Sequence, residues 1–515
     1  MNPNKTGGCK MLAQVLNSIN DFFWSIPFIA FVICIGAYFT IGSKFFTIFH
    51  FGHIVKNTFF TMFNKDAHKK SKGTVSPFEA VCVSVGGNVG MGTIGGVATA
   101  VATGGPGALF WMWIWAFFGM MVKMVETALG CYYRSRNEKG EYYGGGTYML
   151  EKGIARELHH KKFGTTLAVL FGIGFIAQFL GGSQVYTISE ILNTSFGINQ
   201  MLTTVLYTIL LYYVIYHGTT GVAKFEKYAT PVKCLLYLVG CLFLIIFNYQ
   251  NIPHMFYLIF HDAFTGTAAT GGFVGATISK VIGDGVARSI NANEAGQGSS
   301  PFIYGSSNTE HPVRQALWAS FDVFVNTIIV CSLTGLCVIA TGVWDSGIKG
   351  ASLSIAAFET AFGFGGDIFL GIVAILFGIT VTSGWFSFYV AIINHGFRSH
   401  PVLRDRLVKI FKFIYPIPNL VIVGSLVYTG NGPDLFWTIV NISLIAPVAT
   451  NLLGLFILRN KFWELFKDYK ARYMGIGKVD PNFYVFYEDD PEVFAVEEEI
   501  RRKAREKEAA YRARA

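Results

Sequence analysis

Two glycine-rich apolar stretches hold polar groups that could bind a small charged solute. Residues 81–100 read VCVSVGGNVGMGTIGGVATA, and residues 270–301 read TGGFVGATISKVIGDGVARSINANEAGQGSSP. Each glycine costs a helix interior about 1 kcal/mol relative to alanine. The stretches therefore favour either close helix packing or a locally unwound backbone. An unwound backbone offers N–H groups to a carboxylate, and carbonyl groups to an ammonium group or a cation.

Other oxygen-bearing side chains lie in further apolar runs. Thr380, Thr382 and Ser383 offer hydroxyl groups to a hard cation such as Na⁺. Thr380 and Ser383 are three residues apart and so share one side of a helix. Asp322 is a carboxylate within an apolar run, which by default indicates a function, either in ion coupling or in proton transfer.

The motifs of common enzyme classes are missing from these runs. We find no HExxH, no GxSxG and no pair of histidines at ligand spacing, and the chain has no Walker A motif. An intramembrane enzyme and an ATP-driven pump are therefore disfavoured, and no cofactor is expected. Most of the cysteines lie in apolar runs, which is typical of buried small residues rather than of disulfides or a metal site.

The composition describes the environment in which these residues must work. Of 515 residues, 52% are apolar and only 14% are charged, whereas about 25% of the residues in a soluble domain are charged. This predicts an all-α polytopic membrane protein, embedded in a lipid bilayer. The net charge of +9 is then explained by loop asymmetry across the membrane, and no nucleic-acid partner is expected.

Eleven stretches are apolar enough to be transmembrane helices, which need about 20 residues each. They lie at about 20–47, 76–102, 107–132, 164–188, 199–217, 228–248, 271–305, 315–341, 367–394, 406–428 and 433–458. Lysine and arginine gather in alternate connections, including 48–75, 133–163 and the one after the fifth stretch, where we count Lys224, Lys227 and Lys233. Because cytoplasmic loops collect positive charge, we predict an external N-terminus and a cytoplasmic C-terminus, in the plasma membrane of a bacterium or archaeon.

The two glycine-rich stretches are the second and seventh of these spans. If the first span is an extra helix, they are equivalent members of two five-helix halves with opposite orientation. Such an inverted repeat with two broken helices is typical of secondary transporters. A channel also uses broken helices, but a site between two halves favours alternating access.

The predicted organisation follows from this count. Residues 1–75 form the extra helix and a basic loop, 76–270 and 271–458 form the two repeats, and 459–515 form a polar cytoplasmic tail. The end of the tail is predicted to be helical, either as a solvated helix or as a regulatory or oligomer contact. We expect a monomer.

Several motifs resemble the alanine or glycine:cation symporter family, also called the sodium:alanine symporters. They are GGPGALFWMWIWAFFG at 104–119, NEAGQGSSP at 293–301, HPVRQ at 311–315 and NTIIVC at 326–331. The resemblance implies a leucine-transporter-type fold with five plus five helices. It also implies import of a small neutral amino acid such as alanine or glycine, driven by Na⁺ or, in some members, by H⁺.

The chain departs from the family pattern at several positions. Asn291 and Ala292 stand where Phe and Ser are usual, Phe175 and Leu180 where Asn is usual, and Asn326 where Asp is usual. Gly90–Ile94 replaces the usual GxGNI, and Val381 replaces a residue with a hydroxyl group. These differences leave the amino acid open, and a larger polar substrate such as serine, asparagine or glutamine is the alternative.

Substrate contacts are predicted around the two breaks. The amides of the first break would bind the carboxylate and the carbonyls of the second the ammonium group. Gln178 would bind substrate or only bridge helices, Trp385 would line the pocket or face lipid, and Asn291 would read the substrate side chain or cap the broken helix. The predicted substrate-binding residues are Gly86, Gly87, Asn88, Gly90, Thr93, Gln178, Asn291, Ala292, Asn293 and Trp385.

The predicted sodium ligands combine the first break with span nine. They are the carbonyls of Gly87 and Gly90 and the hydroxyls of Thr380, Thr382 and Ser383. Lys123 and Glu126 are predicted to pair near the cytoplasmic end of span three, either as an interfacial salt bridge or as part of a gate.

Overall fold

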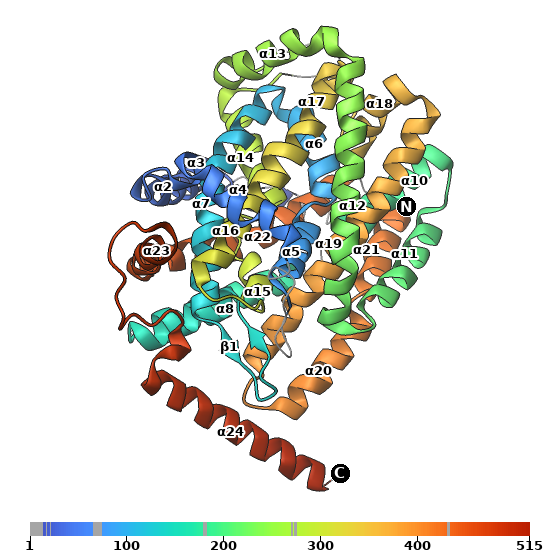
Figure 1. The fold of residues 1–515 in the computed structure, drawn as a ribbon. Helices are drawn as coiled ribbons and strands as arrows, with labels where there is room; N and C mark the ends of the chain where they lie inside the picture. The colour runs from blue at the N-terminus through green and yellow to red at the C-terminus, as the bar shows by residue number, and fades with distance from the viewer. Residues whose placement is uncertain are drawn as a thin grey trace.

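A computed structural model describes residues 14–16, 18–20, 22–64, 75–178, 183–268, 271, 275–429 and 433–514. The described chain is almost entirely helical, with one short antiparallel hairpin formed by β1 (Ser135–Arg136) and β2 (Tyr142–Tyr143). The helices form one bundle, with α13 at one end and α24 across the other (Figure 1). The predicted all-α class is confirmed.

The first half of the chain holds the first broken span and the long helices that follow it. Its α-helices are α2 (Ile26–Gly42), α3 (Phe46–Phe49), α4 (Phe51–Asn57), α5 (Pro77–Asn88), α6 (Val97–Gly104), α7 (Gly107–Tyr132), α8 (Gly146–Met149), α9 (Lys161–Ala177), α10 (Ser183–Phe196), α11 (Gln200–Ile215), α12 (Gly218–Phe247) and α13 (Ile252–Thr265). A π-helical segment, η3 (Gly92–Gly96), leads into α6, and another, η4 (Leu150–Glu157), follows α8.

The second half repeats the pattern of a broken span followed by long helices. Its α-helices are α14 (Ile278–Asn293), α15 (Ser300–Tyr304), α16 (Pro312–Val323), α17 (Ser332–Ala340), α18 (Ala351–Phe362), α19 (Phe364–Gly396), α20 (Pro401–Ile414), α21 (Ile417–Thr429), α22 (Pro433–Ile457), α23 (Arg459–Met474) and α24 (Pro491–Arg514). The π-helical segment η7 (Phe324–Cys331) joins α16 to α17. The helix predicted at the end of the tail is present as α24.

Local signals explain where the first broken span begins and bends. Ser76 caps α5 by accepting a hydrogen bond from the Glu79 amide, and the Glu79 carboxylate accepts one from the Ser76 amide, so the two form a capping box. Pro77 at the first helical position is preorganised for the helix. The helix ends at Asn88, and Gly92–Gly104 continues at an angle of 49°.

The second broken span begins and ends in the same manner. The Thr277 hydroxyl caps α14 by accepting a hydrogen bond from the Lys280 amide. The helix stops at Asn293 because Glu294 adopts the left-handed conformation, with φ 57°. A short turn then leads to α15. Both predicted interruptions are therefore present.

Fewer helices qualify as spans on their own than the eleven predicted. Within the described chain, five helices are long and apolar enough, and the number rises to seven if each of two bent pairs is one span. Several predicted spans are divided between shorter helices, such as α9 and α10 or α14 and α15. The count of eleven and the inverted repeat stay predictions.

Several predicted connections contain helices, among them α13 and α18. In addition, α12 begins at Gly218 rather than near 228. Lys233, counted above as a loop lysine although it falls within the predicted span 228–248, lies inside this membrane-type helix and is fully buried, as is Glu226. The sequence alone places these charged residues in a loop because they follow an apolar run. It cannot show that helices packed around α12 bury them.

Candidate functional site

The two breaks lie close together, and Trp385 on α19 joins them. The indole Nε1–H of Trp385 lies 3.3 Å from the Gly87 carbonyl in the first break and 3.1 Å from Glu294 Oε1 in the second. Phe175 stacks on the indole at 5.1 Å between ring centroids. Among the predicted residues, Trp385 and Gly87 thus meet at the point where both broken spans approach each other.

The end of α14 is held by a buried ion pair. Lys123 Nζ donates to the Asn293 carbonyl at 2.7 Å and lies 2.8 Å from Asp322 Oδ2, and both charged side chains are 0% exposed. The same oxygen of Asp322 accepts hydrogen bonds from the Ser84 hydroxyl at 2.7 Å and the Asn88 amide at 2.8 Å. Asp322 therefore connects α5, α7 and α16.

This arrangement corrects the predicted pairing of Lys123 with Glu126. Glu126 Oε2 accepts hydrogen bonds from the amides of Gly296 and Gly298, at 3.1 and 3.2 Å, and from the Asn451 side chain at 2.9 Å. Both α7 residues are buried, so neither forms an interfacial salt bridge. Glu126 binds the unwound turn after α14, because a carboxylate satisfies backbone N–H groups that have lost their helical partners.

Other predicted substrate residues gather at the second break. Gln178 Oε1 accepts a hydrogen bond from Gln297 at 2.7 Å, and its buried Nε2 has no hydrogen-bond partner among the residues that the structure describes. The Ala292 carbonyl accepts one from the Asn326 amide at 2.7 Å. Asn293 donates to Thr327 at 3.0 Å. Leu180 lies outside the described residues.

Asn291 faces a different surface from these residues. It lines a cavity of about 400 Å³ between α6 and α14, near the end of the molecule that carries α13. Its Nδ2 lies 3.4 Å from Asn441 Oδ1. Lys280, Asp284 and Arg288, which stand at four-residue spacing in the sequence, line the same cavity.

The predicted cation ligands are only partly brought together. Gly90 O accepts hydrogen bonds from Thr93 N at 3.0 Å and Thr93 Oγ1 at 2.5 Å, so Gly90 and Thr93 close a local turn. Thr382 instead faces Tyr207 on α11, at 2.6 Å.

Thr380 and Ser383 do face the first break and α12, but each already has a charged partner. Lys233 Nζ donates to Thr380 Oγ1 and to the carbonyls of Gly86 and Val89, at 3.0 and 2.7 Å for the carbonyls. Ser383 donates to Glu226 Oε1 at 2.8 Å. Glu226 Oε2 also accepts a hydrogen bond from Thr230, at 2.6 Å.

The sequence interpretation missed three charged residues at these breaks. Lys233 was counted among the loop lysines after the fifth stretch, Glu226 was not singled out, and Glu294 was noted only as part of the motif at 293–301. Each stands beside or inside an apolar run, which is the signal for an intramembrane charge. Their roles could have been sought on that ground.

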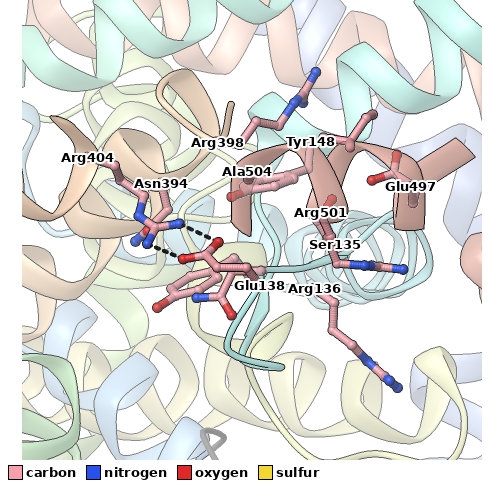
Figure 2. Close-up of a pocket in the computed structure, with 13 residues that line it drawn as sticks. Ser135, Arg136, Glu138, Tyr148, Asn394, Arg398, Arg404, Glu497, Arg501 and Ala504 are labelled. Atoms are coloured by element: carbon pink, nitrogen blue, oxygen red, sulfur yellow. Dashed lines mark hydrogen bonds and ion pairs between the residues drawn. The ribbon is translucent and has the colours of Figure 1, made fainter. Parts of the chain in front are cut away.

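A second polar cluster lies at the opposite end, between the bundle and α24. Figure 2 shows Arg404 paired with Glu138, with Arg501 and Ala504 of α24 lining the same pocket. The Arg404–Glu138 contact is bidentate, at 2.5 and 3.0 Å. Glu497 of α24 pairs with Arg156 at 2.6 Å. The pocket is thus closed by the tail helix.

Arginine and lysine set the protonation of this cluster. Burial by itself raises the pKa of Glu497, but the charges of Lys152 and Arg156 lower it overall. Burial also opposes ionisation of Glu151, and the side chains of His395 and Arg398 reverse the shift, so its pKa lies far below the usual range. These carboxylates are ionised at neutral pH.

Comparison with solved structures supports the fold. A structure of MhsT in complex with L-phenylalanine has a TM-score of 0.55 and 13% identity, and the match covers 77% of this chain and 99% of that one. A Na⁺-coupled sialic acid symporter in a substrate-bound outward-open state has a TM-score of 0.50 and 15% identity, with coverage of 88% and 92%. At these identities the likeness concerns the fold alone.

Comparison with sequences supports a membership in one transporter family. The sodium/alanine symporter AgcS of Methanococcus maripaludis is 30% identical over 86% of this chain and 94% of its own length. The "Probable sodium/glutamine symporter GlnT" of Bacillus subtilis is 30% identical over 92% and 94%. The model of the sodium:alanine symporter family matches residues 9–483. This protein is a transporter rather than an enzyme, and the chain belongs to the sodium:alanine symporter family.

Proposed function

We propose that this protein imports a small neutral amino acid, such as alanine or glycine, in symport with Na⁺ by alternating access. The observation that carries the proposal is the meeting of two broken helices at Trp385, deep within the bundle. Broken helices expose backbone groups for a zwitterion near the membrane midplane. Membership in a family of cation-coupled amino-acid symporters supports the same function.

The charges around the breaks suit a zwitterion accompanied by a cation. Four buried carboxylates face two buried lysines there, namely Glu126, Glu226, Glu294 and Asp322 against Lys123 and Lys233. A buried carboxylate is costly unless a positive group lies beside it. A substrate ammonium group beside Glu294, together with a coupling cation, would supply that charge.

Two buried oxygens are the candidates for contact with Na⁺. Within the described part of the chain, Asn88 Oδ1 and Asp322 Oδ1 have no hydrogen-bond partner, although Asn88 Nδ2 donates to Asp322 Oδ2 at 2.8 Å. Buried polar atoms are ordinarily satisfied, so an unpartnered pair indicates a missing ligand. The ion would be carried with the substrate rather than kept as a resident cofactor.

The alternative is a larger polar amino acid, or H⁺ as the coupling ion. Asn291 lines the cavity between α6 and α14 and not the turn at Trp385, so its amide, which offers both a donor and an acceptor, would favour a polar side chain only if the substrate also passes through this cavity. The relative named for glutamine shows that the family includes such assignments. Asp322 would be the first candidate for proton coupling.

We also propose the topology. Residues 76–270 and 271–458 form the inverted repeat after an extra helix in 1–75, and 459–515 lie in the cytoplasm. The N-terminus is then outside, the α24 end is cytoplasmic, and the monomer resides in the plasma membrane. Basic residues at the α24 end, including Arg398 and Arg404, agree with this orientation.

The test is uptake into proteoliposomes with a panel of labelled amino acids, each with and without a Na⁺ gradient. We expect saturable uptake of alanine or glycine that is lost when choline replaces Na⁺ at constant pH. Uptake driven by a pH gradient alone would assign the coupling to H⁺. No uptake of any neutral amino acid would refute the proposed function.

A further inference from the structure

The ammonium group of Lys233 occupies the position where the sequence predicts a free cation. Lys233 is fully buried on α12. Its Nζ donates to the carbonyls of Gly86 and Val89, at the end of α5, and to the hydroxyl of Thr380 on α19. These are carbonyl and hydroxyl oxygens from the same break and the same helix that were predicted to bind Na⁺.

The match is chemical as well as positional. An ammonium group has three donors, and here it has three oxygen acceptors, so its hydrogen-bonding capacity is filled. The end of α5 carries partial negative charge, which attracts any cation placed there. A lysine that reaches this point supplies a positive charge that is tethered to α12.

The other lysine at a break is held differently. Lys123 donates to one carbonyl, that of Asn293, but its second partner is the carboxylate of Asp322 at 2.8 Å. The three contacts of Lys233 are all with neutral oxygens. Lys123 is therefore one half of an ion pair, whereas Lys233 replaces an ion.

The neighbouring hydroxyl group supports this distinction. Ser383 lies on the same face of α19 as Thr380. Its hydroxyl group donates its proton to the Glu226 carboxylate. Glu226 lies seven residues before Lys233, two turns along α12 and on the same face. The pair of α12 side chains therefore engages two of the three hydroxyl groups that were expected to coordinate Na⁺, those of Thr380 and Ser383.

We propose that Lys233 is a built-in cation, whose ammonium group takes the place of a free ion between α5 and α19. The inference deepens the proposed function, because it means that the ion coupled to transport binds elsewhere. It also identifies Lys233 as a residue that sets the number of cations the protein needs.

The test replaces the tethered charge by a free one. In proteoliposomes, the initial rate of amino-acid uptake is measured for wild type and Lys233→Ala across a Na⁺ series balanced with choline at constant pH. At low Na⁺, we expect the uptake rate of Lys233→Ala to be at least tenfold lower than that of wild type, and at high Na⁺ we expect the two rates to be similar. The Hill coefficient for Na⁺ should be about one higher in the variant. Methylammonium is expected to restore the rate as well.

Lys224→Ala is the matched control, because Lys224 lies on the same helix but is exposed. It is expected to keep the Na⁺ dependence of wild type. A folded Lys233→Ala with the wild-type dependence would overturn the proposal. So would a folded Lys233→Ala that stays inactive at every concentration of Na⁺ and methylammonium.

A second variant decides the matter if Lys233→Ala does not fold. Thr380→Val keeps the shape of the side chain and removes its oxygen. If no free Na⁺ binds there, the half-saturating Na⁺ concentration stays within twofold of wild type, whatever the rate. A rise of tenfold or more would show that Thr380 ligates Na⁺ and would overturn the proposal.

Failure of the proposed function is distinguished by a readout that needs no transport. Na⁺ is expected to raise the unfolding temperature of purified Lys233→Ala more than that of wild type, because only the variant has the vacated position. Equal effects of Na⁺ on the two folded proteins would count against the built-in cation, even if no transported amino acid has been found.

Discussion

The charged residues at the two breaks and those beneath α24 differ in their exposure to solvent. At the breaks, Lys123 and Asp322 are 0% exposed and are bound by backbone and side-chain groups from several helices. Beneath α24, Arg156 is 26% exposed and Glu497 6% exposed. Solvent therefore reaches Arg156 in the second cluster, although the Arg404–Glu138 pair in the same cluster is 3% and 4% exposed.

The contrast shows which charges matter for transport and which for attachment of the tail. Removing one partner of a buried pair costs about 3 to 5 kcal/mol, because the other charge stays buried and unpaired. Pairs near the surface contribute about 0 to 1 kcal/mol. Mutations at the breaks should therefore change uptake strongly, and mutations beneath α24 should change local order slightly.

The largest effect is expected from Asp322→Asn. The substitution keeps the shape but leaves the Lys123 ammonium without its carboxylate. We expect uptake in proteoliposomes to fall at least a hundredfold, since about 3 kcal/mol corresponds to more than a hundredfold in rate or affinity. Ser320→Ala, on the same helix and equally buried, is the control and should keep most of the uptake. Uptake by Asp322→Asn within threefold of wild type would contradict the expectation that the buried charges at the breaks control transport.

Gln178→Ala should weaken substrate affinity about ten- to a hundredfold. Loss of a hydrogen bond to a charged group costs about 1.5 to 3 kcal/mol. The buried and unpartnered Nε2 of Gln178 is the atom available for a substrate carboxylate. The measurement is the half-saturating substrate concentration, with protein abundance as the control. An unchanged value in a well-expressed variant would leave Gln178 as a bridge to Gln297.

Asn291→Phe should alter substrate preference rather than abolish transport. The substitution restores the ring typical of the family and removes a donor and an acceptor from the cavity wall. In a competition series against labelled alanine, we expect serine, asparagine or glutamine to compete with wild type at least as well as glycine does. In the variant, competition by these polar amino acids relative to glycine should be about tenfold weaker. A wild type restricted to alanine and glycine, with no change on substitution, would make Asn291 a structural residue.

The smallest effect is expected from Glu497→Gln, and it should depend on pH. The pKa of Glu497 is lowered in the folded protein, so its stabilising effect is present at pH values above the unfolded pKa of about 4.3. The effect is lost as the pH falls through the lower folded pKa. At pH 7, amide hydrogen exchange in 491–514 should be about fivefold faster in the variant, which corresponds to about 1 kcal/mol.

At a pH below the folded pKa the two proteins should exchange equally after correction for the intrinsic rate. Glu506→Gln is the control, because Glu506 is exposed and pairs only locally with Arg502 on α24. A difference between wild type and Glu497→Gln that persists at low pH would mean that the glutamate stabilises the tail without its charge.

Much of the class and fold could be predicted because the signals are local. The glycines at 86–96 and the turn after Asn293 interrupt helices through the conformational preferences of the residues themselves. Hydropathy located α7 at the same limits as predicted, 107–132. It failed at α12, which begins at Gly218 before the predicted limit of 228, because hydropathy along the chain cannot register that packing buries Glu226 and Lys233.

The candidate site could be predicted only in outline. Gly87 and Trp385 are both predicted substrate-binding residues. They are 298 residues apart, so nothing in the sequence indicates that they contact each other. Thr380 and Ser383 are predicted Na⁺ ligands because their hydroxyl groups carry oxygen. Whether such an oxygen binds a free ion or a charged side chain depends on the residues of the neighbouring helix, here α12.

The sequence by itself determined the membrane environment, the two interrupted helices and the family of this protein. Those properties follow from apolar runs, glycine clusters and short motifs, each of which acts over a few turns of helix. Only the tertiary structure decided that Lys123 pairs with Asp322 rather than with Glu126, and that Lys233 lies at the end of α5. The physical reason is that a buried charge takes its partner from whichever helices pack around it, and that packing joins residues far apart in the chain.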